Sequence, residues 1–335
     1  MSSETVDGYT PPPVRGGIGR EWPDPFLEFW IEIPDSVLIQ TRNARRLGVE
    51  TILITGANTL VGANLMAELS ASNQVFGVSA DASPNECFAA YQPTVVIHCG
   101  SASNACWASP GEPDQTASDW AEAARVAECR FVLISSDAVF SGPWMFHEED
   151  CSAVCESPEA KRIRAIEQSV IATDPNALVV RTHAFGWTPT GSGWLEDGLA
   201  ALESQQVIAA DTTRHATPIL ATELASLVMQ AIESDLTGVC HIAGAERVNP
   251  TQFWQQVARE FGIGEVTTEI ANATDRPARG FGRGETSLDC QRVRQELGGS
   301  LPMLSESLRK LHEQAENGFR DQLQSTVDET LPVAA

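Results

Sequence analysis

Residues 50–182 alternate between short apolar runs and longer amphipathic stretches. Each run is about five residues long and apolar almost throughout, a pattern typical of a strand buried on both faces. The stretches between the runs are long enough for helical crossovers that join parallel strands. Strands are predicted at 51–55, 74–79, 94–99, 130–135 and 177–182, and helices at 60–70, 119–129 and 158–172. The pattern predicts a doubly wound, parallel α/β sheet of the Rossmann type.

The alternation becomes less regular after residue 186. The predicted elements there are helices at 198–204, 222–234, 250–261 and 301–317, a strand at 238–243, and a Gly/Arg-rich loop at 272–286. The apolar strand at 238–243 fits the main sheet. We therefore expect a core at 49–186, a smaller C-terminal subdomain at 187–325 from which 211–244 returns to the core, and a tail at 326–335.

A separate extension, 1–48, precedes the first predicted strand. Its first 17 residues are polar and rich in Pro and Gly, which predicts disorder. Residues 20–48 contain Trp22, Phe26, Phe29 and Trp30 close together. We expect this arm to pack on the body of the chain, on a second copy in a homodimer, or on a partner protein.

The first strand leads into a turn of the kind that holds a dinucleotide. Gly56 allows a tight turn, Gly62 allows the following helix to approach the strand, and the helix N-terminus faces phosphate. Thr59 occupies the position of the middle glycine and adds a Cβ there. Ser79 stands where an acid usually binds the ribose, with Asp81 two residues further on, so the choice between NAD and NADP is not readable.

Composition excludes several classes of function. The net charge of −23 argues against nucleic acid and anionic membranes as partners, and no apolar run is long enough to span a bilayer. The N-terminus has no secretory pattern, and the eight cysteines suggest free buried thiols and a cytoplasmic protein. We expect no metal site, because Cys151 and Cys155 lack partners and the acidic run 147–150 is a loop.

Several ordered segments resemble one known family. They are ILITGANTLVG, PTVVIHCGSAS, FVLISSDAVFSG, VVRTHAFG, ATPILATELASLV, GVCHIAG and TSLDCQRVRQELG. Together they cover about residues 50–315 and resemble the extended short-chain dehydrogenases/reductases, specifically the dTDP-4-dehydrorhamnose reductase (RmlD-like) group. The resemblance implies an NAD(P)-binding sheet and a C-terminal substrate-binding subdomain that closes over a nucleotide-sugar or a related small molecule.

The resemblance also implies positions for the two ligands. The cofactor would lie along Gly56, Asn58, Thr59, Leu60, Gly62, Ser79, Cys99, Gly100 and Ser101. His98-Cys99-Gly100 replaces the family's Asn-Ala-Ala segment. The substrate would contact His183 and Thr217.

Reduction in that family uses a Ser or Thr, a Tyr that protonates the carbonyl oxygen, and a Lys four residues later on the same helix face. The hydroxyl position corresponds to Ser136. When the helix is aligned on Glu167-Gln168, the tyrosine falls on Glu159 and the lysine on Ile163. The chain has tyrosines only at positions 9 and 91, so no Tyr-x-x-x-Lys pair exists.

Three interpretations remain open at this point. The chain is a degenerate or atypical reductase that keeps the fold and a nucleotide, an active reductase with a replaced proton donor, or a non-enzymatic regulatory or interaction subunit. Candidates for a replaced donor are Glu159, His98, His147 and His183. A hydrolase is disfavoured because Ser135-Ser136 lacks the Gly-x-Ser-x-Gly context.

Overall fold

The computed structural model describes residues 50–328 except 101–102, 104–106, 108–115, 207, 267 and 271–283. The predicted extension 1–48, with its segments 1–17 and 20–48, lies outside the described residues. So do Ser101 and residues 329–335 of the predicted tail.

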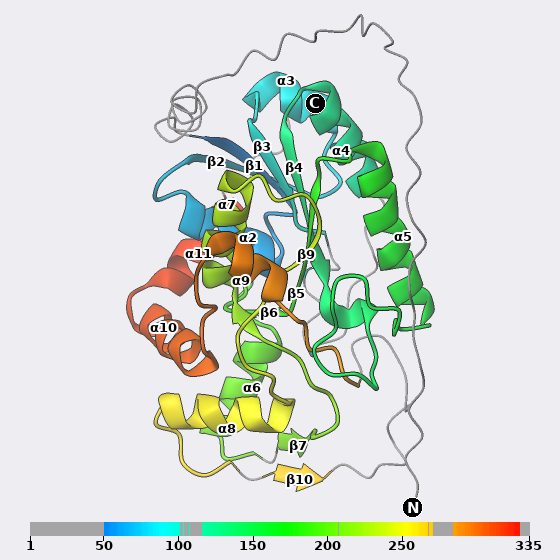
Figure 1. The fold of residues 1–335 in the computed structure, drawn as a ribbon. Coiled ribbons are helices and arrows are strands. Elements are labelled where there is room, and N and C mark those ends of the chain that lie inside the picture. The colour runs from blue at the N-terminus through cyan, green and yellow to red at the C-terminus, as the bar shows by residue number, and fades with distance from the viewer. Residues whose placement is uncertain are drawn as a thin grey trace, which may run out of the picture. The chain divides into compact units, whose positions relative to one another are not determined.

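Six parallel strands form the central sheet in the order β2-β1-β3-β4-β5-β9 (Figure 1). Their bounds are Thr51–Thr55 for β1, Gln74–Val78 for β2, Val95–His98 for β3, Arg130–Ser136 for β4, Leu178–Thr182 for β5 and Gly238–His241 for β9. The strand order reverses at β1, and the turn after β1 therefore opens at the carboxyl edge where α/β sheets bind ligands. The expected Rossmann-type sheet is confirmed.

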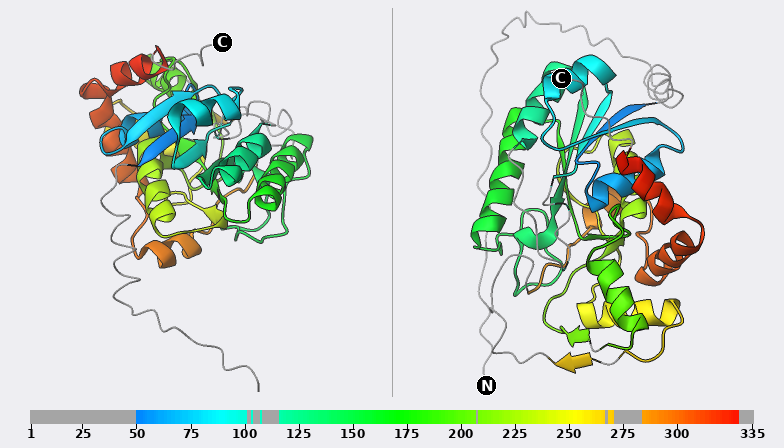
Figure 2. Two further views of the ribbon diagram at one scale, coloured as in Figure 1. Left: turned by 90° about the horizontal axis from the view of Figure 1, so that it is seen from above. Right: turned by 180° about the vertical axis from the view of Figure 1, so that it is seen from behind.

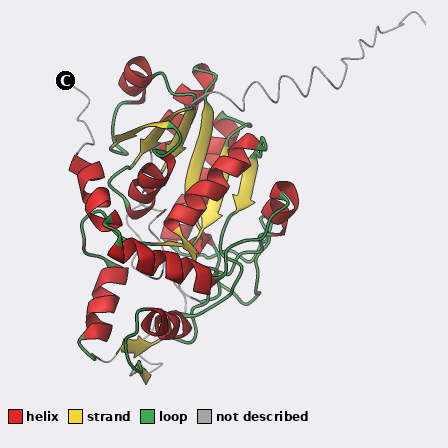
Figure 3. Ribbon diagram, turned by 90° about the vertical axis from the view of Figure 1, so that its left-hand side faces the viewer, coloured by secondary structure: helices red, strands yellow, loops and turns green. Residues whose placement is uncertain are grey.

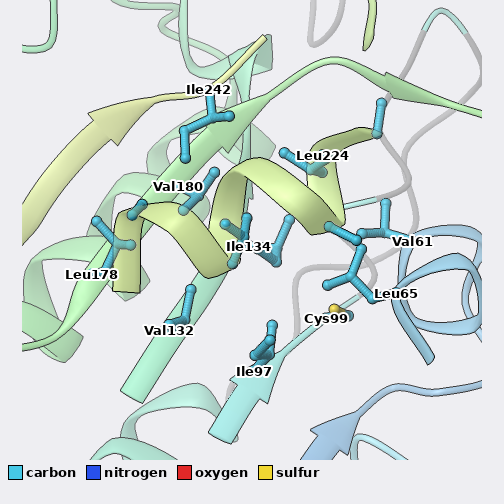
Figure 4. Packing of buried hydrophobic residues seen from close by; sticks show 14 of the residues in the cluster. Val61, Leu65, Ile97, Cys99, Val132, Ile134, Leu178, Val180, Leu224 and Ile242 are labelled. Carbon is cyan, nitrogen blue, oxygen red and sulfur yellow. The ribbon is translucent and has the colours of Figure 1, made fainter. Parts of the chain in front are cut away.

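Helices cover both faces of this sheet (Figure 2). One face carries α2 (Leu60–Leu69), α7 (Ala221–Glu233) and α9 (Gln291–Leu297), and the other carries α3 (Pro84–Tyr91), α4 (Ala117–Val126) and α5 (Pro158–Thr173). Alternate strand residues enter opposite layers: Val132 and Ile134 join the α2–α7 layer, whereas Phe131 and Leu133 join the α4 layer. Figure 4 shows the first of these clusters between the sheet and α7.

A second group of elements follows β5 and stands apart from the main sheet (Figure 3). It contains α6 (Trp194–Glu203), β7 (Ile208–Ala210), α8 (Pro250–Glu260) and β10 (Thr268–Ile270). An aromatic-rich cluster, including Phe185, Phe253 and Trp254, forms its core. α8 begins where Asn249 and Gln252 form a reciprocal capping box. The remaining elements are the 3₁₀ helix η2 (Asp137–Val139), β6 (Ala184–Phe185), β8 (Ile219–Leu220), α10 (Leu304–Glu316) and α11 (Phe319–Asp328).

Three described helices were not predicted from the sequence: α3, α9 and α11. In α3 only Cys87 is buried, and α9 buries only Val293. Without an apolar stripe a short helix gives no periodic signal. No described helix has both the length and the apolar character that crossing a membrane would require.

Candidate functional site

The turn between β1 and α2 depends on both of its glycines. Gly56 has φ of +69°, and a Cβ there would stand 2.0 Å from the carbonyl oxygen of Cys99, the residue just after neighbouring β3. A Cβ on Gly62 would stand 2.2 Å from the Gly56 carbonyl oxygen. Neither position has room for a side chain, so the helix N-terminus is held directly against the strand end.

Thr59 closes this turn with its own side chain. Its hydroxyl donates to the Gly56 carbonyl at 2.7 Å and accepts from the Gly62 N–H at 3.0 Å, so Thr59 is the N-cap of α2. Its φ of −82° is ordinary for a residue with a side chain. The replacement of glycine by threonine therefore keeps the shape of the turn. The neighbouring residue, Asn58, is exposed.

The residues after β2 and β3 complete this edge of the sheet. Ser79 is exposed, and its hydroxyl donates to the Asp81 carboxylate. Cys99 directs its side chain into the apolar cluster of Figure 4, and burial raises the pKa of its thiol far above the usual range. The Gly100 carbonyl accepts from the Ser103 N–H at 3.0 Å and from its hydroxyl at 2.7 Å. Cys99 can therefore reach a ligand only through its backbone.

Ser136 ends β4 beside a buried carboxylate. Its hydroxyl accepts from the Ala138 N–H at 3.1 Å and lies 3.4 Å from Asp137 Oδ1. The other oxygen, Asp137 Oδ2, accepts from His183 Nδ1 at 2.8 Å and from the Thr286 hydroxyl at 2.5 Å. One carboxylate thus joins the predicted serine of β4 to the predicted histidine after β5.

The outer nitrogen of this histidine has no hydrogen-bond partner among the residues that the structure describes. His183 is only 3% exposed, and its Nε2 makes no hydrogen bond within the described part of the chain. The ring of Trp107 meets the imidazole edge-on, with centroids 4.7 Å apart, and Trp107 Nε1 is also buried and unpaired there. A buried polar atom without a partner costs about 1–3 kcal/mol of stability. An unpaired buried group of this kind needs an explanation, and a ligand that completes its hydrogen bond is one.

Helix α5 carries other side chains where the family pattern has its tyrosine and lysine. The Glu159 side chain is 40% exposed and forms a surface ion pair with Arg162 at 3.8 Å. Ile163 is 2% exposed and belongs to the apolar cluster of the α2–α7 layer.

A buried ion pair stands behind the site. Arg181 on β5 binds Glu167 of α5 with Nε at 3.0 Å and Nη2 at 2.8 Å, and the Ser135 hydroxyl donates to the same carboxylate at 2.5 Å. Both charged side chains are less than a tenth exposed. The network fixes α5 against β4 and β5.

Three further predicted residues lie in structural contacts. The Thr217 hydroxyl accepts from the Leu288 N–H at 3.2 Å, and His98 Nδ1 lies 2.6 Å from the Thr55 hydroxyl. His147 stacks on Phe140, and both of its ring nitrogens have polar neighbours, at 3.3 Å and 3.1 Å. Burial lowers the pKa of His147. No cluster suited to a metal ion occurs among the described residues.

Sequence reasoning assigned no role to Asp137, Thr286 or Trp107. Asp137 had a signal, because it follows Ser136 directly in a segment that resembles the family. Thr286 had none: it lies 149 residues from Asp137 and meets it only through folding. Trp107 follows β3 in a polar, irregular segment whose path the sequence pattern does not indicate.

A family model described as the RmlD substrate binding domain matches residues 50–317. The chain belongs to this family. The resemblance seen in the sequence is thereby confirmed.

Individual relatives of this RmlD-family chain are more distant. The "Probable low-salt glycan biosynthesis reductase Agl14" of Haloferax volcanii is 26% identical over 193 residues, 55% of this chain. The match spans 63% of that protein, less than two thirds of its length.

Solved structures confirm the fold. A dTDP-4-dehydrorhamnose reductase of Clostridium acetobutylicum is 21% identical with a TM-score of 0.68, covering 79% of this chain and 99% of its own. The Bacillus anthracis enzyme in complex with NADP is 17% identical with a TM-score of 0.69, covering 80% and 100%.

Proposed function

We propose that the chain binds a nicotinamide dinucleotide and a nucleotide-sugar, and that it lacks the Tyr-Lys proton relay of its family. The observation that carries the proposal is the contrast between the two halves of the site. The β1–α2 turn keeps both glycines that have no room for a Cβ, whereas α5 offers half-exposed Glu159 and buried Ile163.

The residues of the turn fit the phosphate-bearing half of such a cofactor. A helix N-terminus beside a bare glycine turn attracts pyrophosphate, and Thr59 completes the turn without left-handed backbone. The exposed Asp81, held by Ser79, would accept a ribose hydroxyl. When bound, the nicotinamide ring would supply or accept a hydride. The chain's own contribution would be to hold the dinucleotide and to place Ser136 beside the substrate.

Two substitutions of the same kind test this cofactor site. Asn58→Asp places a negative charge next to the proposed pyrophosphate. Asn176→Asp places the same charge on an exposed residue just before β5, at the edge of the sheet that lies opposite the carboxyl edge. We expect N58D to weaken NADPH or NADH binding about tenfold, equivalent to about 1.4 kcal/mol of repulsion. N176D should leave it unchanged. Nicotinamide fluorescence and calorimetry measure both, and equal affinities in both variants would contradict the site.

Separate experiments test the nucleotide-sugar site and the missing Tyr-Lys relay. dTDP binding to the wild type, followed by calorimetry, tests the nucleotide-sugar site. Turnover of dTDP-4-dehydrorhamnose with NADPH then separates a binding protein from a reductase. Because Glu159 is ion-paired at the surface, Glu159→Gln should leave any turnover unchanged. A positioned acid contributes about 10²–10⁴-fold to the rate. A fall in turnover of about 10²-fold or more in this variant would therefore identify Glu159 as the proton donor.

A further inference from the structure

The buried imidazole of His183 has one ring nitrogen, Nε2, without a hydrogen-bond partner in the described part of the chain. Asp137 Oδ2 lies 2.8 Å from Nδ1, so the neutral ring carries its proton on Nδ1 and presents Nε2 as an acceptor. Thr286 holds the same carboxylate oxygen at 2.5 Å. Trp107, in edge contact with the ring, offers an unpaired donor at Nε1.

An unpaired acceptor on one ring and an unpaired donor on the ring that contacts it match a hydroxyl group, which both donates and accepts a hydrogen bond. A sugar ring supplies hydroxyl groups of this kind. A protonated Nε2 would instead donate to a carbonyl oxygen, the group from which such a hydroxyl is formed by reduction. The carboxylate that orients His183 also touches Ser136, the hydroxyl expected beside the reacting carbon.

We propose that His183 exchanges the proton at the reacting oxygen of a keto-sugar or its alcohol, with Asp137 and Thr286 as positioning residues. This inference rests on the proposed function. In the reducing direction the Nε2–H proton of His183 would pass to the carbonyl oxygen, and the hydride that a bound dihydronicotinamide would supply would reach the carbonyl carbon. The C=O double bond becomes a C–OH bond, and neutral His183 takes a new proton from solvent.

The competing donors have weaker geometry for this role. Glu159 is a surface ion-pair partner, and both ring nitrogens of His147 have polar neighbours. His183 combines a carboxylate that orients the ring with a buried, unpaired nitrogen on its other side.

The experiment uses the full chain with NADPH, dTDP-4-dehydrorhamnose and dTDP-rhamnose as probes. His183→Asn keeps a donor for Asp137 but removes Nε2, and Asp137→Asn removes the orienting carboxylate. His312→Asn, whose side chain is partly exposed on α10, is the matched control. We expect H183N to slow single-turnover NADPH oxidation about 10²–10⁴-fold. D137N should slow it as well, while NADPH affinity is kept in both variants and H312N turns over like the wild type.

A second readout needs no turnover. In ¹⁵N NMR of the wild type, the His183 ring should show the Nδ1–H form, and dTDP-rhamnose should shift its Nε2 resonance. The signal is assigned by its loss in H183N or, if that variant does not fold, by its change in D137N. An unmoved Nε2 resonance with the sugar bound, or full turnover in H183N, would overturn the proposal.

The two proposals fail in different ways. If the wild type binds both ligands but does not turn over, the proton-exchange role of His183 is wrong and the binding function stands. If the wild type binds neither NADPH nor dTDP, the proposed function is wrong and the role of His183 falls with it.

Discussion

At the scale of single residues, Thr59 shows how a substitution in a motif can be absorbed locally. Glycine at this position would leave the backbone bare. Threonine instead caps the helix with its hydroxyl and also binds the Gly56 carbonyl. The turn therefore keeps its shape by a side-chain hydrogen bond rather than by backbone freedom.

Removing this hydroxyl should weaken the turn. We expect Thr59→Ala to lower the free energy of unfolding by about 1 kcal/mol, the usual cost of losing an N-cap. Ser70→Ala removes a hydroxyl at the other end of α2, where it donates to the Met66 carbonyl. Urea unfolding should show a clear loss for T59A and little change for S70A, and equal losses would contradict the capping role.

Buried His241 gives the fold a dependence on pH. Burial, together with the charge of Arg181, lowers its pKa to about 3. The unfolded chain protonates this histidine near its ordinary pKa of about 6.5, whereas the folded chain does not. The free energy of unfolding therefore falls as the pH drops below about 6.5, by about 1.4 kcal/mol per pH unit.

The variant His241→Asn isolates this contribution. From about pH 8 to about pH 5 the wild type should lose about 2 kcal/mol more than H241N. Urea unfolding at several pH values measures the difference in slope, which does not depend on any packing loss common to all pH values. Parallel pH curves for the two proteins would show that His241 is not kept neutral by the fold.

At the scale of elements, α5 has a structural role even where its expected chemistry is missing. Ile163 packs into the core, and Glu167 binds Arg181 of β5 and Ser135 of β4. The helix is thus fixed on the strands whose ends carry Ser136, Asp137 and His183. The position of the candidate site depends on this buried pair.

Breaking one partner of the pair should be costly. We expect Glu167→Gln to lower the free energy of unfolding by about 3–5 kcal/mol, because the Arg181 charge stays buried without its counterion. The double variant Glu167→Leu, Arg181→Met should recover much of this loss. Urea unfolding of Glu167→Leu, Arg181→Met and the double variant measures the coupling, and additive losses would contradict a direct pair.

At the scale of the whole molecule, the net charge of −23 works against compactness. Some acidic residues also end helices, where the helix dipole disfavours negative charge. Glu233 is the last residue of α7, and Glu296 lies in the last turn of α9; both are exposed. Salt should therefore stabilise the protein by screening.

Neutralising these two ends should imitate the effect of salt. We expect the double variant Glu233→Gln, Glu296→Gln to gain about 0.5–1 kcal/mol at low ionic strength. In about 1 M NaCl the Debye length falls to about 3 Å, and most of the gain should disappear. Thermal unfolding at both salt concentrations tests this, and a gain that does not depend on salt would point to a cause other than charge.

The strands of the sheet were predictable to within two residues, because runs such as Val95–His98 and Leu178–Thr182 are buried on both faces and have no other explanation. The glycines of the turn were also predictable from local sequence, because a tight turn between a strand and a helix has no room for a Cβ at Gly56 and Gly62. Short helices such as α3 escaped prediction, because only one of its eight residues is buried.

The sequence by itself determined the fold class, the family and the absence of a Tyr-x-x-x-Lys pair, since these depend on local patterns of residues. The tertiary structure decided which groups meet at the carboxyl edge of the sheet. Asp137 follows β4, and its carboxylate binds both His183, which follows β5, and Thr286, which comes from a loop far along the chain. Hydrogen bonds between such separated residues leave no periodic trace in the sequence, because they form only when parallel strands end side by side.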